Sequence, residues 1–151
     1  LEPPGHARHH TALVDLAGGA VIAGDAVGVQ FPGAGIYPAL PPPDVDLAAG
    51  LRSLDLLARR RPTGLFLTHF GPVPDPAEAI DAARSQWRLM GEAGRAAAGP
   101  EAVAEEIERR LPLEEIVADP DALATWRWLG WAEANADGIA GWAARDGGDE
   151  L

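Results

Sequence analysis

The sequence predicts an α/β protein, because its composition changes about halfway along the chain. Before about residue 75, short β-like apolar runs alternate with loops rich in glycine and proline. After that point Ala, Glu and Arg follow one another in helical patterns. We therefore expect strands in residues 1–74 and a purely helical region in residues 75–151. A hydrophobic content of 47% over 151 residues is enough to fill the core of one ordinary domain.

The charge balance excludes several classes of function. The chain carries 12 basic and 23 acidic side chains, a net charge of -11. A nucleic-acid partner requires a basic surface to neutralise phosphates, so none is expected. The same charge disfavours anionic membranes, and no run approaches the roughly 18 apolar residues of a membrane span. We therefore expect a small-molecule substrate.

The absence of cysteine excludes disulfides, thiolate zinc sites and cysteine nucleophiles together. It is also typical of a reducing compartment, so we expect a cytoplasmic protein. The first residue is Leu1 and not methionine, which indicates a piece of a longer protein.

Three apolar runs in the first region predict strands. Residues 11–16 (TALVDL) and 20–23 (AVIA) flank an Ala-Gly-Gly turn signal and predict a hairpin that ends at Gly24-Asp25. Residues 65–68 (LFLT) predict a short buried strand that ends at His69. A long loop is predicted over residues 26–43.

Cap residues and prolines predict the helices. Asp44 is the expected cap of a first helix that Pro62 ends, and Asp75-Pro76 predicts the start of a second. Gly99-Pro100 separates the second helix from a third, and Asp119-Pro120 predicts a final helix to about residue 144.

Four tryptophans occur in the final predicted helix, and they leave two interpretations open. Its apolar residues cover about half of the circumference, which is wider than a simple surface helix needs. The helix is then either wedged into the core or part of an interface in a homo-oligomer, since exposed aromatic patches mark contacts. The four are Trp126, Trp128, Trp131 and Trp142.

Candidate metal ligands occur where predicted strands meet loops. Asp25 and His69 each follow an apolar strand, and His6, His9 and His10 lie close together near the start of the chain. Imidazole and carboxylate ligands suit zinc, iron or manganese. Taken singly, Gly24-Asp25 is equally consistent with a simple turn, and three neighbouring histidines with a polar loop surface.

The order of three segments resembles the later half of the metallo-beta-lactamase superfamily. These segments are residues 4–13 (PGHARHHTAL), 24–26 (GDA) and 68–71 (THFG). They match a Pro-Gly-His-x-x-x-His motif, a Gly-Asp at the end of the next strand, and a Thr-His after a helix and strand. The resemblance implies the C-terminal half of an αββα sandwich over residues 1–74, followed by a helical extension.

The resemblance also implies a dinuclear site with two divalent metal ions, most often zinc, with iron or manganese as alternatives. His6 matches a ligand of the first metal, Asp25 the bridging carboxylate and His69 a ligand of the second metal. His10 matches a supporting residue, for which orienting a loop or ligand is the expected role. His9 replaces a commoner glycine.

One motif of that superfamily is absent from this sequence. The missing His-x-His-x-Asp-His supplies two ligands to each metal, and it contains the family's proton-transfer aspartate. Catalytic zinc sites normally have three protein ligands plus water. We therefore expect neither metal to be held firmly, and the isolated fragment to be inactive, unless the missing half comes from upstream residues or from a partner. No catalytic acid, base or serine nucleophile can be assigned.

If the site is complete, the resemblance implies hydrolysis of a small ester, thioester or lactone by a metal-bound hydroxide. Two alternatives stay open. One is an iron-dependent oxidoreductase similar to the superfamily's sulfur dioxygenases, and the other is a non-catalytic half-domain or assembly module. Tyr37 in the long loop either contacts substrate or is structural.

Overall fold

The computed structural model describes residues 1–31, 33–69, 71–128 and 131–146, which form a mixed α/β fold. Three strands form one sheet in the order β1-β2-β5, with β1 spanning Leu13–Val14, β2 Val21–Gly24 and β5 Leu65–Leu67. Strand β2 pairs antiparallel with β1 and parallel with β5. The predicted hairpin and the third strand are therefore confirmed.

Helix α1 spans Leu47–Arg59, and its cap differs from the expected one. Asp46 and not Asp44 is the N-cap, because the Asp46 carboxylate accepts a hydrogen bond from the backbone N–H of Ala49 at 2.8 Å. The carboxylate of Asp44 instead lies 3.1 Å from the guanidinium of Arg8. The prediction of Asp44 was wrong, since either aspartate is compatible with a cap and only the path of the chain decides between them.

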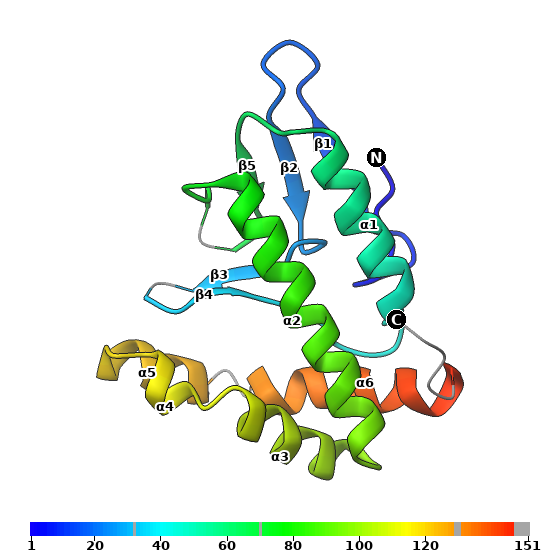
Figure 1. Cartoon of the computed structure of the whole chain (residues 1–151), viewed down its shortest axis with the longest axis vertical. Coiled ribbons are helices and arrows are strands. Elements are labelled where there is room, and N and C mark those ends of the chain that lie inside the picture. The colour runs from blue at the N-terminus through cyan, green and yellow to red at the C-terminus, as the bar shows by residue number, and fades with distance from the viewer. Residues whose placement is uncertain (32, 70, 129–130, 147–151) are drawn as a thin grey trace.

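A second hairpin lies inside the segment that was expected to be a long loop. Strand β3 (Val29–Phe31) pairs antiparallel with β4 (Gly35–Tyr37), and Val29 is opposite Tyr37. The prediction of a loop was wrong because each strand has only three residues, too few for an alternating pattern to be recognised. The hairpin lies between the larger sheet and the lower helices (Figure 1).

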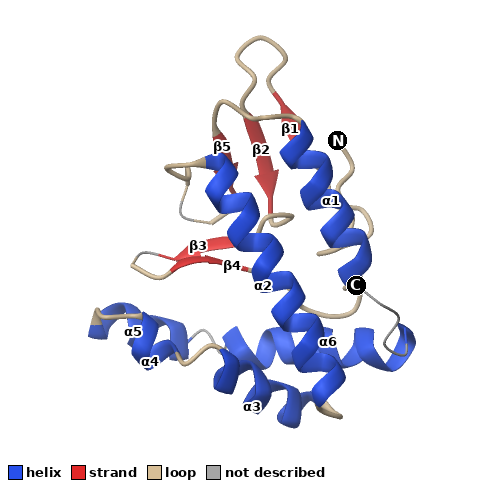
Figure 2. Ribbon diagram, in the orientation of Figure 1, coloured by secondary structure: helices blue, strands red, loops and turns tan. Residues whose placement is uncertain are grey.

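Helices α2 (Pro76–Ala96) and α3 (Pro100–Arg110) follow the predicted boundaries. The carboxylate of Asp75 accepts hydrogen bonds from the N–H groups of Ala77 and Glu78, as an N-cap does. Helices α1 and α2 lie together across one face of the three-stranded sheet, and α2 continues to the helices at the opposite end of the molecule (Figure 2).

The segment predicted as one final helix, from Asp119-Pro120 to about residue 144, contains two described helices. They are α5 (Pro120–Trp128) and α6 (Trp131–Asp146), and a short helix α4 (Leu113–Ile116) precedes them. The predicted continuity of this helix falls on residues 129–130, which lie outside the described part of the chain.

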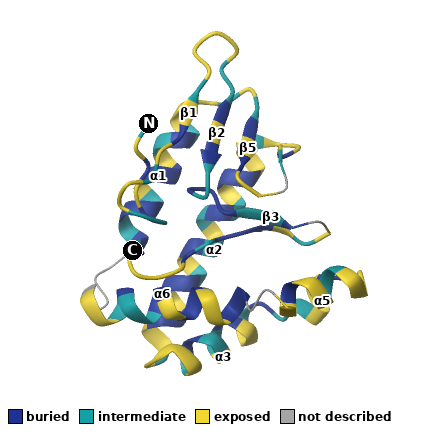
Figure 3. Ribbon diagram, turned by 180° about the vertical axis from the view of Figure 1, so that it is seen from behind, coloured by how far each residue is buried: buried dark blue, intermediate teal, exposed yellow. Residues whose placement is uncertain are grey.

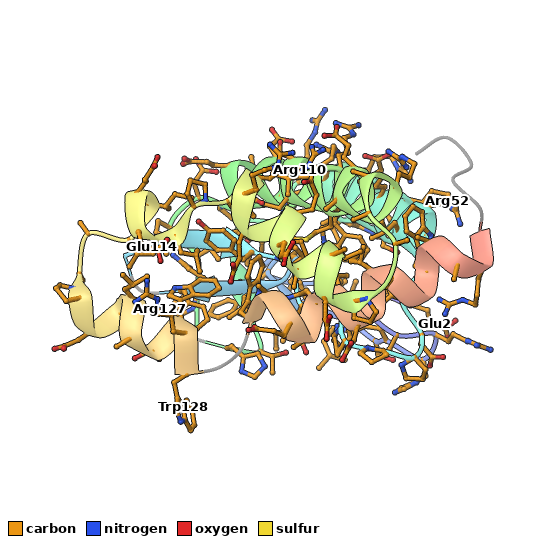
Figure 4. All side chains as sticks on the ribbon, turned by 90° about the horizontal axis from the view of Figure 1, so that it is seen from below. Glu2, Arg52, Arg110, Glu114, Arg127 and Trp128 are labelled. Atoms are coloured by element: carbon orange, nitrogen blue, oxygen red, sulfur yellow. The ribbon has the colours of Figure 1, made fainter. Side chains whose placement is uncertain are left out.

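Three of the four tryptophans belong to the core, as the first interpretation predicted. Trp126, Trp131 and Trp142 are at most 9% exposed. The ring of Trp126 stacks on Phe31 at 3.7 Å between centroids, so the β3–β4 hairpin is covered by the C-terminal helices. Trp128 is 83% exposed and projects outward from the end of α5 (Figure 4). An interface between copies stays a prediction.

One hydrophobic cluster runs through both halves of the chain, from Val21 to Trp142. On the sheet face away from α1 and α2, by contrast, Leu13, Ile22 and Phe66 are 61%, 50% and 42% exposed. Burial therefore lies mainly where helices pack, and the tip of the β1–β2 hairpin is exposed (Figure 3). The strand β5, which was expected to be buried, has Leu65 and Leu67 buried and Phe66 exposed, because only one face of this sheet is covered. No helix in the described residues combines the length and apolarity needed to cross a membrane.

Candidate metal centre

Asp25 and His69 meet because they follow two neighbouring parallel strands. Gly24 at the end of β2 pairs with Leu67 at the end of β5. Since the carboxyl ends of parallel strands lie at the same edge of a sheet, the next residues of both strands reach the same place. The His69 Nε2 atom lies 3.7 Å from Asp25 Oδ1. The two predicted ligands are thus brought together.

His6 reaches the same carboxylate from the N-terminal segment. That segment is fixed on α1, because the Gly5 carbonyl accepts a hydrogen bond from the N–H of Asp46 at 2.9 Å and Ser53 donates one to the Pro4 carbonyl at 2.6 Å. A Cβ atom on Gly5 would lie 2.4 Å from the Cα atom of Gly50, so only glycine allows this approach. The His6 Nε2 atom then lies 3.8 Å from Asp25 Oδ2.

A backbone hydrogen bond fixes which nitrogen of His6 is available. His6 Nδ1 lies 2.6 Å from the carbonyl oxygen of Ala39. A carbonyl can only accept, so Nδ1 carries the proton and donates it. In the neutral ring, Nε2 then presents its lone pair toward Asp25, which is the arrangement seen when a histidine binds a metal ion.

His10 supports Asp25 through the backbone. The N–H of Asp25 donates to His10 Nε2 at 3.0 Å, so that nitrogen is an acceptor and the ring is neutral. Burial is the main cause that lowers the pKa of His10; His6 and, less strongly, His9 lower it further, while Asp25 opposes them. The contact also requires Gly24, because a Cβ at that position would lie 2.6 Å from His10 Nε2.

The chemistry of these residues fits a divalent metal ion. Asp25 Oδ1 is buried and has no hydrogen-bond partner among the described residues, although a buried carboxylate oxygen normally has one. A cation would satisfy it. The geometry is more open than that of a loaded site, since two ligands of tetrahedral zinc lie about 3.4 Å apart. The His6–Asp25 and His69–Asp25 distances of 3.8 and 3.7 Å are longer than this. Accordingly, no group of three or more metal-ligating side chains in the described ranges is close enough to hold a metal ion as it stands.

The C-terminal helices hold the segment that orients His6, which the sequence did not predict. Asn135 of α6 is 2% exposed, and its Oδ1 atom accepts a hydrogen bond from the N–H of Leu40 at 2.7 Å. Trp131 Nε1 donates to the carbonyl of Pro38 at 3.1 Å. Ala39, whose carbonyl binds His6, lies between these two anchored residues. The sequence feature that could have indicated this contact is Asn135, a polar residue on the apolar face of a predicted helix.

Tyr37 and His9 lie outside this network of contacts. Tyr37 is 3% exposed and packs edge-on against Trp126 and Trp131, which favours its structural interpretation. Burial raises the pKa of its hydroxyl. His9 is exposed.

No protein-family model matches this sequence, and no curated protein matches it. A solved structure does: a metallo-beta-lactamase family protein from Thermus thermophilus, with a TM-score of 0.63 and 22% sequence identity. The match covers 97% of this chain. The chain has part of the metallo-beta-lactamase fold.

This chain spans 44% of the length of the Thermus thermophilus protein, so less than half of that metallo-beta-lactamase-fold chain has a counterpart here. The predicted fold class, a partial metallo-beta-lactamase fold within an α/β protein, is confirmed. Because the match covers nearly the whole chain, it extends through most of the helices after residue 75.

Proposed function

We propose that the chain supplies His6, Asp25 and His69 to a dinuclear metal site of a hydrolase that acts on a small ester, thioester or lactone. The observation that carries this proposal is Asp25, whose buried Oδ1 atom has no hydrogen-bond partner among the described residues and whose carboxylate lies between two imidazoles from different segments. A carboxylate that uses both oxygens can bridge two cations and offset their repulsion. The shared fold supports the same assignment.

Each residue has a separate role in the proposed site. His6 would bind one ion through Nε2 while Ala39 holds the ring, and His69 would bind the other at the open edge of the sheet, where its side chain is 54% exposed. His10 would keep the Asp25 backbone in place. The bound metal ions would lower the pKa of a water and supply hydroxide near neutral pH.

The remaining ligands have to come from outside this set of residues. The exposed row Leu13, Ile22 and Phe66 supports this, because Leu13 pairs with Ile22 and Ile22 with Phe66 across all three strands. An apolar row on an open sheet face is suited to packing against a second sheet. That sheet would carry the His-x-His-x-Asp-His motif, and we expect turnover only when the motif is supplied.

Zinc titration of the whole chain by calorimetry tests the proposal without requiring turnover. We expect binding that weakens at least tenfold in Asp25→Asn and in His69→Ala, because both remove a ligand. His9→Ala is the matched control, since this exposed histidine lies close in sequence to His6 and His10 without contacting Asp25 in the structure. Equal zinc affinity in all four proteins would overturn the assignment.

A further inference from the structure

An apolar pocket of about 400 Å³ adjoins the candidate metal centre. Its walls come from β3, from the segment 39–41 and from α6, and His69 lies among the lining residues. The same imidazole that faces Asp25 therefore also borders this pocket. Ala39 lines the pocket as well, while its carbonyl holds His6.

The polar side chains that α6 contributes to the wall have their hydrogen bonds satisfied within the protein. Asn135 Oδ1 accepts from Leu40 N–H, and Asn135 Nδ2 donates to the Trp131 carbonyl at 2.8 Å. The indole N–H of Trp131 donates to Pro38. The polar side chain of the pocket lining that faces the candidate metal centre is therefore the imidazole of His69.

We propose that this pocket binds the acyl chain of the substrate, so that the hydrolase acts on aliphatic acyl esters or thioesters with an uncharged chain. This inference rests on the proposed function. A charged or strongly polar chain would lose its hydration without finding a partner in the wall. A volume near 400 Å³ is at the small end of ligand pockets, which favours a short to medium chain.

The proposal assigns a role to the helices after residue 75. Trp131, Ala134 and Asn135 of α6 form one side of the pocket, so α6 would select the chain while the strand ends hold the ions. The reacting carbonyl would lie toward His69, where the pocket borders the candidate centre.

Binding of straight-chain primary alcohols to the full chain, without metal, tests the pocket directly. Trp131 lines the pocket, so its indole N–H resonance reports binding by NMR. We expect the affinity to rise about fourfold for each added methylene until the pocket is full. Ala134→Trp should abolish this dependence, because Ala134 is an exposed lining residue from which a large ring would extend into the pocket. Ala144→Trp, an exposed site on the same helix, is the matched control and should retain it.

A second arm uses zinc and alkyl hydroxamates, which combine a metal-binding head with an apolar chain. We expect the same dependence on chain length and the same loss in Ala134→Trp. Affinity that is independent of chain length in either arm, or that Ala134→Trp leaves unchanged, overturns the proposal. If zinc does not bind at all, the proposed function fails, and the alcohol arm still decides whether the pocket binds an alkyl chain.

Discussion

Asp25 is held by a different kind of contact on each side. Its N–H donates to His10, and its two carboxylate oxygens face His6 and His69. Gly24 precedes it with a φ of +60°, a backbone conformation that residues other than glycine rarely adopt. The position of this carboxylate therefore depends on one glycine and one neutral imidazole.

Replacing Gly24 with alanine tests this dependence. We expect Gly24→Ala to lower the free energy of unfolding by about 1–3 kcal/mol, from the positive φ and the clash with His10. Chemical denaturation measures it. Gly33→Ala is the control, because Gly33 has a φ of +77° but no atom within 4 Å of its Cβ position.

The cost of the clash between the added methyl group and the His10 ring can be separated from the cost of the positive φ. The clash should make Gly24→Ala more destabilising than Gly33→Ala, and this excess should vanish in a His10→Ala background, where the ring is absent. An equal effect in both backgrounds would show that His10 does not constrain this turn.

The position of Asp25 and His69 could be predicted from the sequence, because an apolar run fixes where a strand ends. The orientation of His6 could not. It depends on the carbonyl of Ala39, which is 33 residues away and lies in the segment expected to be a loop. A contact between residues so far apart in the sequence leaves no local pattern that could predict it.

At the scale of elements, α6 acts on the candidate centre through a segment of backbone. Asn135 and Trp131 bind the residues on either side of Ala39. Gly138 allows the close packing, since a Cβ there would lie 1.9 Å from the Leu40 carbonyl oxygen. The β3–β4 hairpin was missed because tertiary packing, and not periodicity, decides such short elements.

Asn135→Ala should weaken this connection. It leaves the buried N–H of Leu40 without a partner, so we expect a loss of about 1–3 kcal/mol in the free energy of unfolding. The ring resonances of His6 should also shift in NMR spectra. Asp137→Ala, at an exposed position of the same helix, should change neither quantity; an unchanged His6 spectrum in Asn135→Ala would contradict the proposed connection.

Helix α3 should show a pH dependence of stability that is independent of the candidate centre. Hydrogen bonds from Arg109 and then Arg110 lower the pKa of Glu106 to about 2. A carboxylate with a lowered pKa stabilises the fold above its unfolded pKa near 4.5, and this contribution is lost as the pH falls through about 2.

Wild type should therefore be more stable than Glu106→Gln at pH 7, with the difference shrinking below about pH 4.5. NMR titration of the Glu106 side-chain carboxyl checks the midpoint directly. A midpoint near the unfolded value of 4.5 would show that the two arginines do not hold this carboxylate in solution.

At the scale of the whole molecule, the two regions of different composition share one core. Trp87 of α2 packs beneath Gly50 of α1, where a Cβ would lie 1.8 Å from the indole. The composition change near residue 75 marks a change of secondary structure. The hydrophobic cluster does not stop there.

We therefore expect a single cooperative unfolding transition. All five tryptophans lie after residue 75, so fluorescence reports the helical region. The methyl resonances of Val21 and Leu65, both at most 1% exposed, report the sheet. The two midpoints should coincide in denaturant, and separate midpoints would indicate two independently folding parts.

The central claim is that His6 and His69 bind metal ions on either side of Asp25. The most direct measurement is a zinc titration of the chain followed through the imidazole nitrogens by NMR. Zinc should shift the Nε2 resonances of His6 and His69 and leave those of His9 unchanged. In Asp25→Asn the same shifts should require at least tenfold more zinc. Nε2 resonances of His6 and His69 that stay in place at saturating zinc would contradict the claim.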